Sequence, residues 1–314
     1  MNDRLPLMDL TATGQVLGPR LLTTGSAGRT ANIPAHRTVS DLEAVMQRYV
    51  GHYGLNHMKN GGLSRTHQRW LSELARRYRV RLHAHMNCLT EAVDGYVLCG
   101  HVQSLQSPVM DDVTQLLVQS GITIDATAFM HAGYDLLFYF RETKPSTLRD
   151  DLLVNNPKIA RFLPRQRLEA WTGDPSNTSD GHWLRQFGKD LARIVAAGGK
   201  VSMGTHGEIP GIGAYLELKS MSMGGLQPHD LLRSATIVGA EALGYGAELG
   251  SLEPGKIADL QVLDANPLED IDNVLTVQQV MKNGRLYDGD TLAEIYPNPK
   301  PAPRLWWNEA KGGT

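Results

Sequence analysis

Short apolar segments alternate along the chain with longer amphipathic ones. In the longer stretches, apolar side chains recur at i, i+3 and i+4, which predicts helices near residues 39–51, 65–78, 108–120 and 184–198. The shorter segments predict strands at 20–25, 55–59, 80–85, 96–101, 122–127 and 200–206. This alternation of strands and helices indicates a parallel α/β fold, either an open sheet or a barrel.

Local signals suggest where several elements begin and end. Ser40 can cap the first of these helices, because Glu43 follows it three residues later. A further helix is expected over 228–244, with Pro228 at its first position and Gly244 just past its end. Asn283-Gly284 separates two apolar runs, which predicts a β-hairpin with a type I′ turn.

Two segments depart from the alternating pattern. Residues 130–184 are rich in aromatic side chains and proline and are too long for an ordinary connection, so we expect an insertion that folds over one face of the sheet. The chain becomes proline-rich beyond about residue 291 and is interpreted as a tail, in which Trp306 and Trp307 could dock elsewhere.

Composition excludes several classes of protein. The 314 residues contain 31 Lys and Arg against 33 Asp and Glu, and 6% are aromatic, which argues against a nucleic-acid or membrane-surface binder. The two cysteines, Cys88 and Cys99, exclude a disulfide scaffold and a four-cysteine zinc module, and we expect both to be small buried hydrophobic residues. No apolar run reaches the roughly 20 residues of a membrane helix, and no signal peptide is visible, so a cytoplasmic location is expected.

Histidines gather at the ends of the predicted strands. His83 and His85 end one strand, His101 ends the next and His206 ends the last, while Lys59 ends an earlier one. Sites form at the carboxyl ends of parallel strands, and imidazole binds zinc and similar metals. A carboxylated lysine could bridge two metals through its oxygens. The alternative is that each histidine is a hydrogen-bonded structural residue and Lys59 an ordinary solvated lysine.

Several motifs resemble the amidohydrolase superfamily. They are the run from Pro228 to Gly244, the run Gly-Ser-Leu-Glu-Pro-Gly-Lys-Ile-Ala-Asp-Leu beginning at Gly250, and Val-Met-Lys-Asn-Gly-Arg-Leu-Tyr at 280–287. Residues 204–207 and 264–270 are most similar to its imidazolonepropionase-like and prolidase-like branch, and the resemblance spans about residues 14–290. It implies a TIM-type (β/α) barrel portion at 1–246, β-sandwich strands at 247–290 and the Pro-rich tail at 291–314.

The resemblance also implies roles for individual residues. Lys59 becomes the carboxylated bridging lysine on barrel strand four, His83 the metal ligand on strand five with His85 as the competing choice, and His101 the ligand on strand six. His206 stands where most of the superfamily has a metal-binding Asp on strand eight that takes a proton from the attacking water, so His206 is both a metal and a catalytic candidate. Glu217 is a secondary candidate. The cofactor implied is a divalent metal, with zinc expected and iron, manganese or cobalt as alternatives.

The implied activity is metal-dependent hydrolysis of a C–N bond in a small molecule, such as an amide, a cyclic amide or a dipeptide. The expected enzyme class is the hydrolases that act on C–N bonds other than peptide bonds. The family's His-x-His pair on its first barrel strand has no counterpart before residue 83, and residues 18–25 resemble barrel strand three. We therefore expect an incomplete barrel of strands three to eight. The alternatives are a truncated, non-catalytic remnant and a subunit that a partner chain completes; homo-oligomerisation is left open.

Overall fold

A computed structural model shows a chain organised as two compact units. The structure describes residues 4–24, 33–85, 88–101, 108–129, 157–164, 166, 182–207 and 211–305. The first unit consists of Met1–Ala126, Arg193–Ser202 and Arg233–Ser251, and the second of Thr127–Ala192, Met203–Leu232 and Leu252–Thr314.

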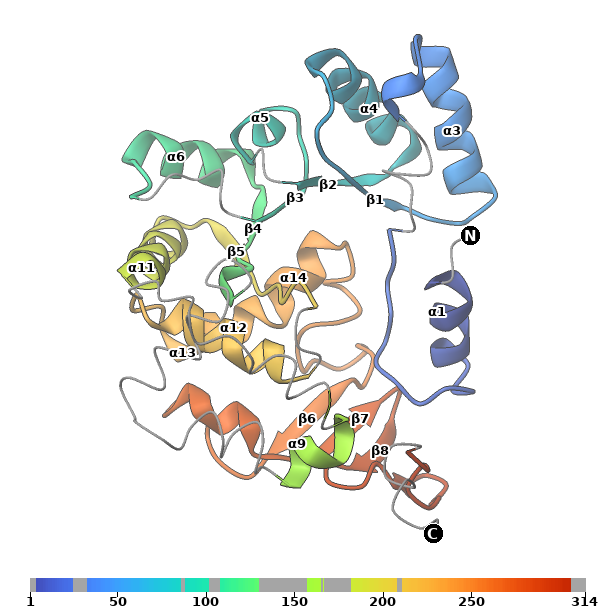
Figure 1. Ribbon diagram of the computed structural model, residues 1–314, viewed down its shortest axis with the longest axis vertical. Coiled ribbons are helices and arrows are strands. Elements are labelled where there is room, and N and C mark those ends of the chain that lie inside the picture. The colour runs from blue at the N-terminus through green and yellow to red at the C-terminus, as the bar shows by residue number, and fades with distance from the viewer. Residues whose placement is uncertain are drawn as a thin grey trace. The chain divides into compact units, whose positions relative to one another are not determined.

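The centre of the first unit is a five-stranded parallel sheet whose spatial order follows the chain order, β1-β2-β3-β4-β5 (Figure 1). The strands are β1 (His57–Asn60), β2 (Arg81–His85), β3 (Leu98–Gly100), β4 (Thr123–Asp125) and β5 (Lys200–Ser202). Side chains alternate between the two faces of a strand, and one face here carries small and apolar residues that are almost completely buried. These residues are Met58, Leu82, Ala84, Cys99, Ile124 and Val201.

Four helices lie along one face of this sheet (Figure 1). They are α3 (Val39–Gly51), α4 (Arg65–Tyr78), α5 (Cys88–Val93) and α6 (Asp111–Ser120), and α4 and α5 contact the strands directly. The unit also contains helix α1 (Arg4–Ala12) and the short 3-10 helix η1 (Ile33–Ala35). The predictions of helices at 39–51 and 65–78 are confirmed to the residue.

The predicted cap of α3 was wrong. Thr38, not Ser40, precedes the helix: its hydroxyl accepts a hydrogen bond from the Asp41 N–H at 3.2 Å, and the Asp41 carboxylate accepts one from the Thr38 N–H at 3.1 Å. The capping box is therefore Thr38–Asp41, two residues before the Ser40–Glu43 pair, and it places Val39 inside the helix.

Two further sequence expectations need correction. Residues 20–24 form no strand, so the parallel sheet has five strands among the described residues rather than the six expected. The helix expected over 228–244 is divided into α13 (Pro228–Ser234) and α14 (Ile237–Ala242). The break falls at Thr236, whose φ of −133° is not helical and which precedes α14 as its N-cap residue. Gly244 does follow the second helix with a φ of +80°.

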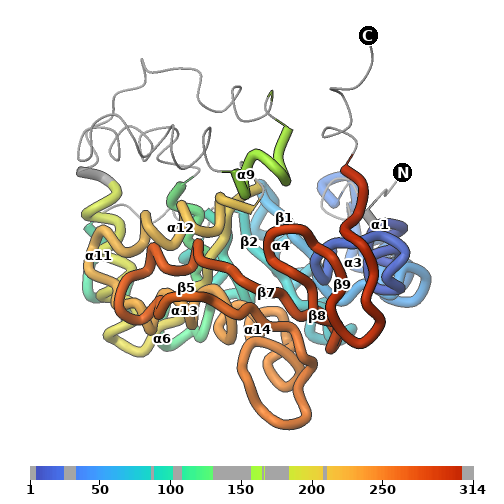
Figure 2. The backbone as a smooth tube through the Cα atoms, turned by 90° about the horizontal axis from the view of Figure 1, so that it is seen from below, coloured from blue at the N-terminus to red at the C-terminus, as the bar shows by residue number. Residues whose placement is uncertain are grey.

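The second unit contains a four-stranded antiparallel sheet, β6 (Leu260–Leu263), β7 (Val277–Lys282), β8 (Arg285–Asp288) and β9 (Glu294–Tyr296). Strands β7 to β9 run side by side in Figure 2. Asn283 and Gly284 join β7 to β8 with φ values of +51° and +73°, which confirms the predicted type I′ hairpin. Strand β9 lies inside the segment expected to be a tail, and the described residues show one sheet where a sandwich was expected.

Helices accompany this sheet within the second unit. They are α9 (Pro157–Phe162), α12 (Ile212–Ser222), the short 3-10 helix η4 (Ile271–Leu275) and most of α11 (His182–Ala196). Helix α12 packs on η4, where Lys219 donates to the Asp272 carboxylate at 2.6 Å. Helix α11 passes so close to Gly224, just beyond α12, that a Cβ on this glycine would lie 1.9 Å from the Gly188 carbonyl carbon.

The two cysteines form a disulfide, which corrects the expectation that they were unpaired. Cys88 begins α5 and Cys99 lies in β3, with their Cα atoms 5.3 Å apart. Both are fully buried, as expected. The pairing was missed because an 11-residue separation in sequence does not show that helix α5 returns against strand β3.

Most of the aromatic segment at 130–184, like Trp306 and Trp307, lies outside the described residues, so the expected covering of the sheet stays a prediction. None of the described helices combines the length and the apolar character needed to cross a membrane.

Candidate functional site

The carboxyl ends of three neighbouring strands in the first unit carry most of the predicted site residues. Lys59 of β1 stands in register with His83 of β2, and His85 of β2 stands in register with Gly100 of β3, which His101 follows directly. Residues in register on parallel strands point to the same side of the sheet, so Lys59, His83 and His85 share the face opposite the helices. The structure places Lys59, His83 and His85 on one face at the carboxyl edge of the sheet, with His101 directly after β3. Their role as metal ligands stays a prediction.

His57 joins this group. It lies two residues before Lys59 on β1 and therefore shares its face. Its Nδ1 is 3.2 Å from Nε2 of His83, and the two ring centroids are 5.3 Å apart. His57 is 4% exposed and His83 7% exposed, so the pair is almost completely removed from solvent. The hydroxyl of Tyr49 donates to the His57 carbonyl and ties helix α3 to the strand at this point.

A second pair of imidazoles lies on the other side of Lys59. The rings of His85 and His101 meet edge to face with centroids 4.9 Å apart. The Lys59 ammonium lies 3.8 Å from the position that a Cβ on Gly100 would occupy, so the lysine side chain reaches over β3. His101 has a φ of +70°, a left-handed conformation that costs energy for a residue with a side chain and is concentrated at functional sites.

The first pair is held in the uncharged form. Burial, helped by the charges of neighbouring His57, Lys59 and Arg81, lowers the pKa of His83 from 6.5 to about 3. Burial also lowers the pKa of His57, with Arg81 adding to the effect and the backbone of Leu243 opposing it. Neutral imidazole is the form that binds metals.

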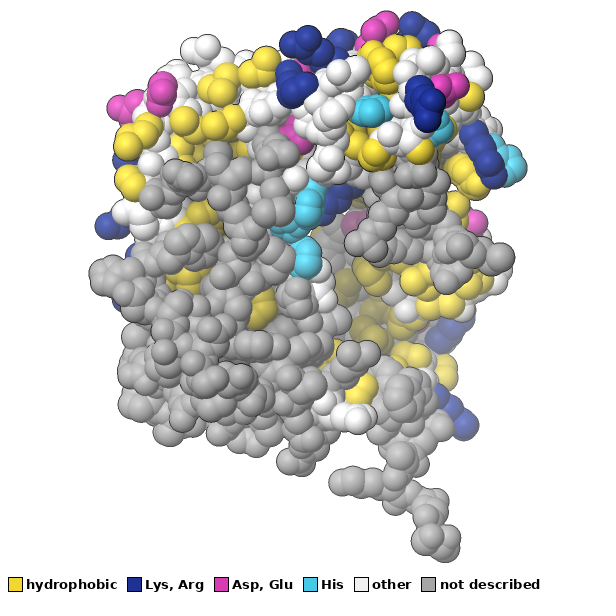
Figure 3. Space-filling model, turned by 45° about the horizontal axis from the view of Figure 1, so that its top comes forward, with side chains coloured by type: hydrophobic (Ala, Val, Ile, Leu, Met, Phe, Trp, Pro, Cys, Tyr) yellow, Lys and Arg dark blue, Asp and Glu magenta, His cyan; other side chains and the backbone are white. Residues whose placement is uncertain are grey.

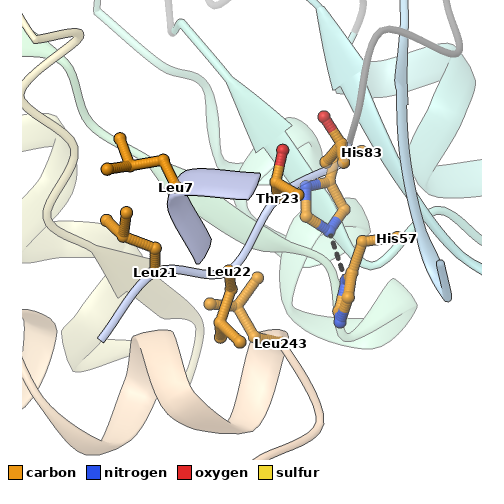
Figure 4. A pocket seen from close by; sticks show the side chains of 8 residues that line it. Leu7, Leu21, Leu22, Thr23, His57, His83 and Leu243 are labelled. Atoms are coloured by element: carbon orange, nitrogen blue, oxygen red, sulfur yellow. Dashed lines mark hydrogen bonds between the residues drawn. The ribbon is translucent and has the colours of Figure 1, made fainter. Parts of the chain in front are cut away.

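The first histidine pair forms the polar end of a pocket. Its cavity volume is about 470 Å³, and its walls are supplied by the N-terminal segment, β1, β2 and the end of α14. Figure 4 shows the two imidazoles meeting nitrogen to nitrogen, with leucine side chains filling the rest of the lining. The lining residues are Leu7, Leu21, Leu22, Thr23, Thr24, His57, His83 and Leu243, and none is charged when the imidazoles are neutral.

The remaining candidates belong to the second unit. His206 follows β5 in a loop, is exposed and has a φ of +55°. Because it lies in the other unit, its convergence with the strand-end histidines stays a prediction. Glu217 is fully buried in α12, where its two carboxylate oxygens accept the backbone N–H groups of Ala128 and Phe129 at 2.7 and 2.8 Å. Through these hydrogen bonds, Glu217 stabilises the backbone that follows β4, which is a structural role.

The side chains at the strand ends are of the kinds that bind divalent metals. Imidazoles lie on both sides of Lys59, and Nδ1 of His57 is 3.2 Å from Nε2 of His83. Figure 3 shows histidine side chains grouped on one face of the molecule with a basic side chain beside them. Among the described residues, no group of three His, Cys, Asp or Glu side chains is close enough to hold an ion. The residue types therefore suit a metal, whereas the described His, Cys, Asp and Glu side chains do not form a complete set of ligands, and Lys59 and a further donor would be needed.

Sequence reasoning missed two residues on this face. His57 could have been found from the spacing His57-Met58-Lys59, because residues two apart in a strand share a face. Asp125 ends β4 in register with Gly100 of β3 and so brings a carboxylate to the same edge. The strand predicted at 122–127 placed Asp125 inside the strand, and only the earlier end of β4 in the structure brings Asp125 to the edge.

Comparison with known proteins gives the architecture a family. The model of the amidohydrolase family matches residues 7–287, which is most of the chain. This chain belongs to the amidohydrolase family. Its mixed α/β fold with a parallel sheet is consistent with the (β/α) barrels of its structural neighbours.

Individual relatives of this amidohydrolase carry out different reactions. A 5-methylthioadenosine/S-adenosylhomocysteine deaminase from Teredinibacter turnerae is 34% identical over 119 residues, which are 38% of this chain but only 26% of that enzyme. A Xaa-Pro dipeptidase structure with bound methionine shares 19% identity over 90% of this chain and 72% of its own, with a TM-score of 0.61. Phenylurea hydrolase B shares 18% identity over 93% of this chain and 73% of its own, with a TM-score of 0.64. The two structures support the fold, and the family supports hydrolysis of C–N bonds.

Proposed function

We propose that this amidohydrolase is a divalent-metal-dependent enzyme that hydrolyses a C–N bond in an amide, a cyclic amide or a dipeptide. The observation that supports the proposal is that Lys59, His83 and His101 lie at one edge of the sheet, at the carboxyl ends of the neighbouring parallel strands β1, β2 and β3. Zinc is the metal that two imidazole donors and a carboxylated lysine favour most directly.

Lys59, His83 and His101 would hold the metal, with His85 as the alternative donor from β2. A bound divalent metal would supply a more acidic water and a polarised carbonyl. Hydrolysis forms a bond from the water oxygen to the carbonyl carbon and breaks the C–N bond, and the departing nitrogen takes a proton. We assign His206 to this proton transfer, because an imidazole can accept and return a proton near neutral pH.

The leucine-lined pocket beside His83 supports a substrate with an apolar acyl portion. A cavity of about 470 Å³ without charged walls accommodates an aliphatic or aromatic group. The relatives' substrates differ from one another, so the pocket rather than the family carries this part of the proposal.

The test is metal analysis of the purified protein followed by hydrolysis assays on N-acyl amino acids, cyclic amides and Xaa-Pro dipeptides. Activity should disappear with 1,10-phenanthroline and return with added zinc. His101→Gln should remove activity, and His52→Gln, which changes an exposed histidine at the end of α3, should not. A protein that binds no metal and hydrolyses none of these substrates would refute the proposal and support a non-catalytic remnant.

A second candidate function is that of a subunit whose barrel a partner chain completes. It is favoured by the two edges of the parallel sheet, because β1 and β5 each have a strand on one side only among the described residues. Light scattering of the purified protein tests it: a monomer that carries out the hydrolysis unaided would exclude this candidate.

A further inference from the structure

The wall of the pocket beside His83 contains no Asp, Glu, Lys or Arg. Of the eight residues that form it, four are leucines, two are threonines and two are histidines. The leucines come from three places in the chain: α1 supplies Leu7, the segment before β1 supplies Leu21 and Leu22, and the residue after α14 is Leu243. Figure 4 shows the leucines grouped on one side of the cavity and the two imidazoles on the other. A ligand in this cavity therefore exchanges its water for apolar side chains over much of its surface.

The leucines of the N-terminal segment form an exposed rim that is anchored to the sheet. Leu7 and Leu22 are 45% and 41% exposed, although both are large apolar side chains. An apolar group in the cavity would cover part of this surface, and each buried methylene improves binding about fourfold. The Tyr49 hydroxyl, which contacts the His57 carbonyl, also lies within hydrogen-bonding reach of the Thr24 carbonyl. Helix α3 therefore holds this segment beside β1.

Two positive side chains flank the histidine end of the pocket. Arg81 begins β2 two residues before His83 and so shares its face. Its guanidinium lies beside Gly244, next to Leu243 of the wall, where it donates to the Ala242 carbonyl at 3.2 Å. Lys59 stands in register with His83 on the neighbouring strand. Because the lining contains no carboxylate, nothing in the wall offsets these two charges for a positively charged ligand.

We propose that this pocket selects its ligand by charge: it binds a neutral apolar group and rejects one that carries an ammonium. An ammonium would give up its hydration among leucines and would face two side chains of its own sign. The inference rests on the proposed function only for the statement that the pocket receives the acyl half of the substrate. It then narrows the substrate to amides with an uncharged acyl group, such as N-acyl amino acids, and disfavours dipeptides with a free amino terminus. Leu7 and Leu22, at the rim, are the residues that set this preference.

The experiment compares two probes of similar size that contain no amide bond and so cannot be hydrolysed. They are 3-phenylpropan-1-ol, which is neutral, and phenylalaninol, which carries an additional ammonium at neutral pH. NMR of the native protein with ¹³C-labelled leucine methyl groups measures both affinities and shows where each probe binds. The neutral alcohol should bind at least about 10-fold more tightly and shift the methyl resonances of Leu21, Leu22 and Leu243. Equal affinities, or no shift of these resonances, would overturn the inference.

A charge placed on the rim tests the same inference in the opposite direction. Leu22→Glu introduces a carboxylate, which should reduce the preference for the alcohol at least about fivefold by weakening its binding and attracting the ammonium. Leu17→Glu is the matched control, because Leu17 is 42% exposed in the same N-terminal segment and does not line the pocket. An unchanged preference in Leu22→Glu, or an equal change in Leu17→Glu, would contradict the assignment.

Turnover separates this inference from the proposed function. The value of kcat/KM should be higher for N-(3-phenylpropionyl)glycine than for phenylalanylglycine, since the two differ by the same ammonium. If neither is hydrolysed while the native protein still prefers the neutral alcohol, the proposed function fails and selection by charge stands. Hydrolysis of the dipeptide with an equal or higher kcat/KM would overturn the inference and leave the hydrolase function intact.

Discussion

Glu91 offers a direct test of the electrostatics inside the first unit. This residue of α5 is 0% exposed, and neither carboxylate oxygen has a hydrogen-bond partner among the described residues. Burial, assisted by the negative charge of Asp94, raises its pKa from 4.5 to about 7. Arg65, which would compensate the charge, is instead paired with Asp94 at 3.0 Å. We predict that Glu91→Gln stabilises the protein at alkaline pH.

The sign and size follow from proton linkage. Below pH 4.5, Glu91 is protonated in both the folded and the unfolded chain and adds nothing to the pH dependence. Between pH 4.5 and about 7 the unfolded chain releases this proton first, so the native protein loses stability as the pH rises. A pKa that moves from 4.5 to about 7 corresponds to about 3 kcal/mol, and water entering around the carboxyl reduces this to about 2 kcal/mol.

Urea unfolding of the native protein and of Glu91→Gln at pH 4.5 and pH 8 measures the effect. The variant should gain less than about 0.5 kcal/mol over the native protein at pH 4.5 and about 2 kcal/mol at pH 8. The control is Glu73→Gln on α4, because the Glu73 side chain is 58% exposed and makes only a surface ion pair. If the gain of Glu91→Gln were the same at both pH values, the buried-charge explanation would be wrong.

Three further changes probe the packing. Reduction of the Cys88–Cys99 disulfide should lower the free energy of unfolding by about 3 kcal/mol, because the bridge spans 11 residues. Urea unfolding with and without dithiothreitol measures this change, and identical unfolding curves would contradict the disulfide. Gly224→Ala should lower the melting temperature by many degrees because its Cβ would meet the α11 backbone, whereas Gly51→Ala, which has open space around it, should change it little. Glu217→Gln should cost about 2 kcal/mol and speed hydrogen exchange of the two N–H groups it holds; unchanged exchange would remove its structural role.

The sequence predicted helices better than it predicted their ends and breaks. The helices at 39–51 and 65–78 carry a complete apolar stripe and end where the stripe ends, so their boundaries were readable. Ser40 and Thr38 both have the chemistry of a cap, and only the backbone at Thr38, with a φ of −134°, distinguishes them. The helix predicted at 228–244 breaks at Thr236, which the apolar periodicity of the sequence did not indicate.

The site residues that lie at the ends of strands could be predicted from the sequence. The contacts between residues on neighbouring strands could not. Lys59, His83 and His101 follow apolar runs, and parallel pairing then brings them to one edge. The meeting of His57 with His83 requires the register of β1 against β2, which a single sequence does not contain. Residues 20–24 contain the β-branched and leucine pattern of a strand and yet form none, because pairing with a neighbour decides strand formation.

The interleaving of the two units has a consequence for dissecting the protein. The chain passes from one unit to the other five times, after Ala126, Ala192, Ser202, Leu232 and Ser251. No single cut can therefore release an intact half: a fragment that stops at Ala126 lacks the terminal strand of its own sheet, β5, which returns only at Lys200. Deletions from the C-terminus remove only residues of the second unit as far as Leu252, but they leave its other stretches attached to the first unit. Only a rearranged gene that joins the separated stretches with new linkers could isolate the half that carries the histidines.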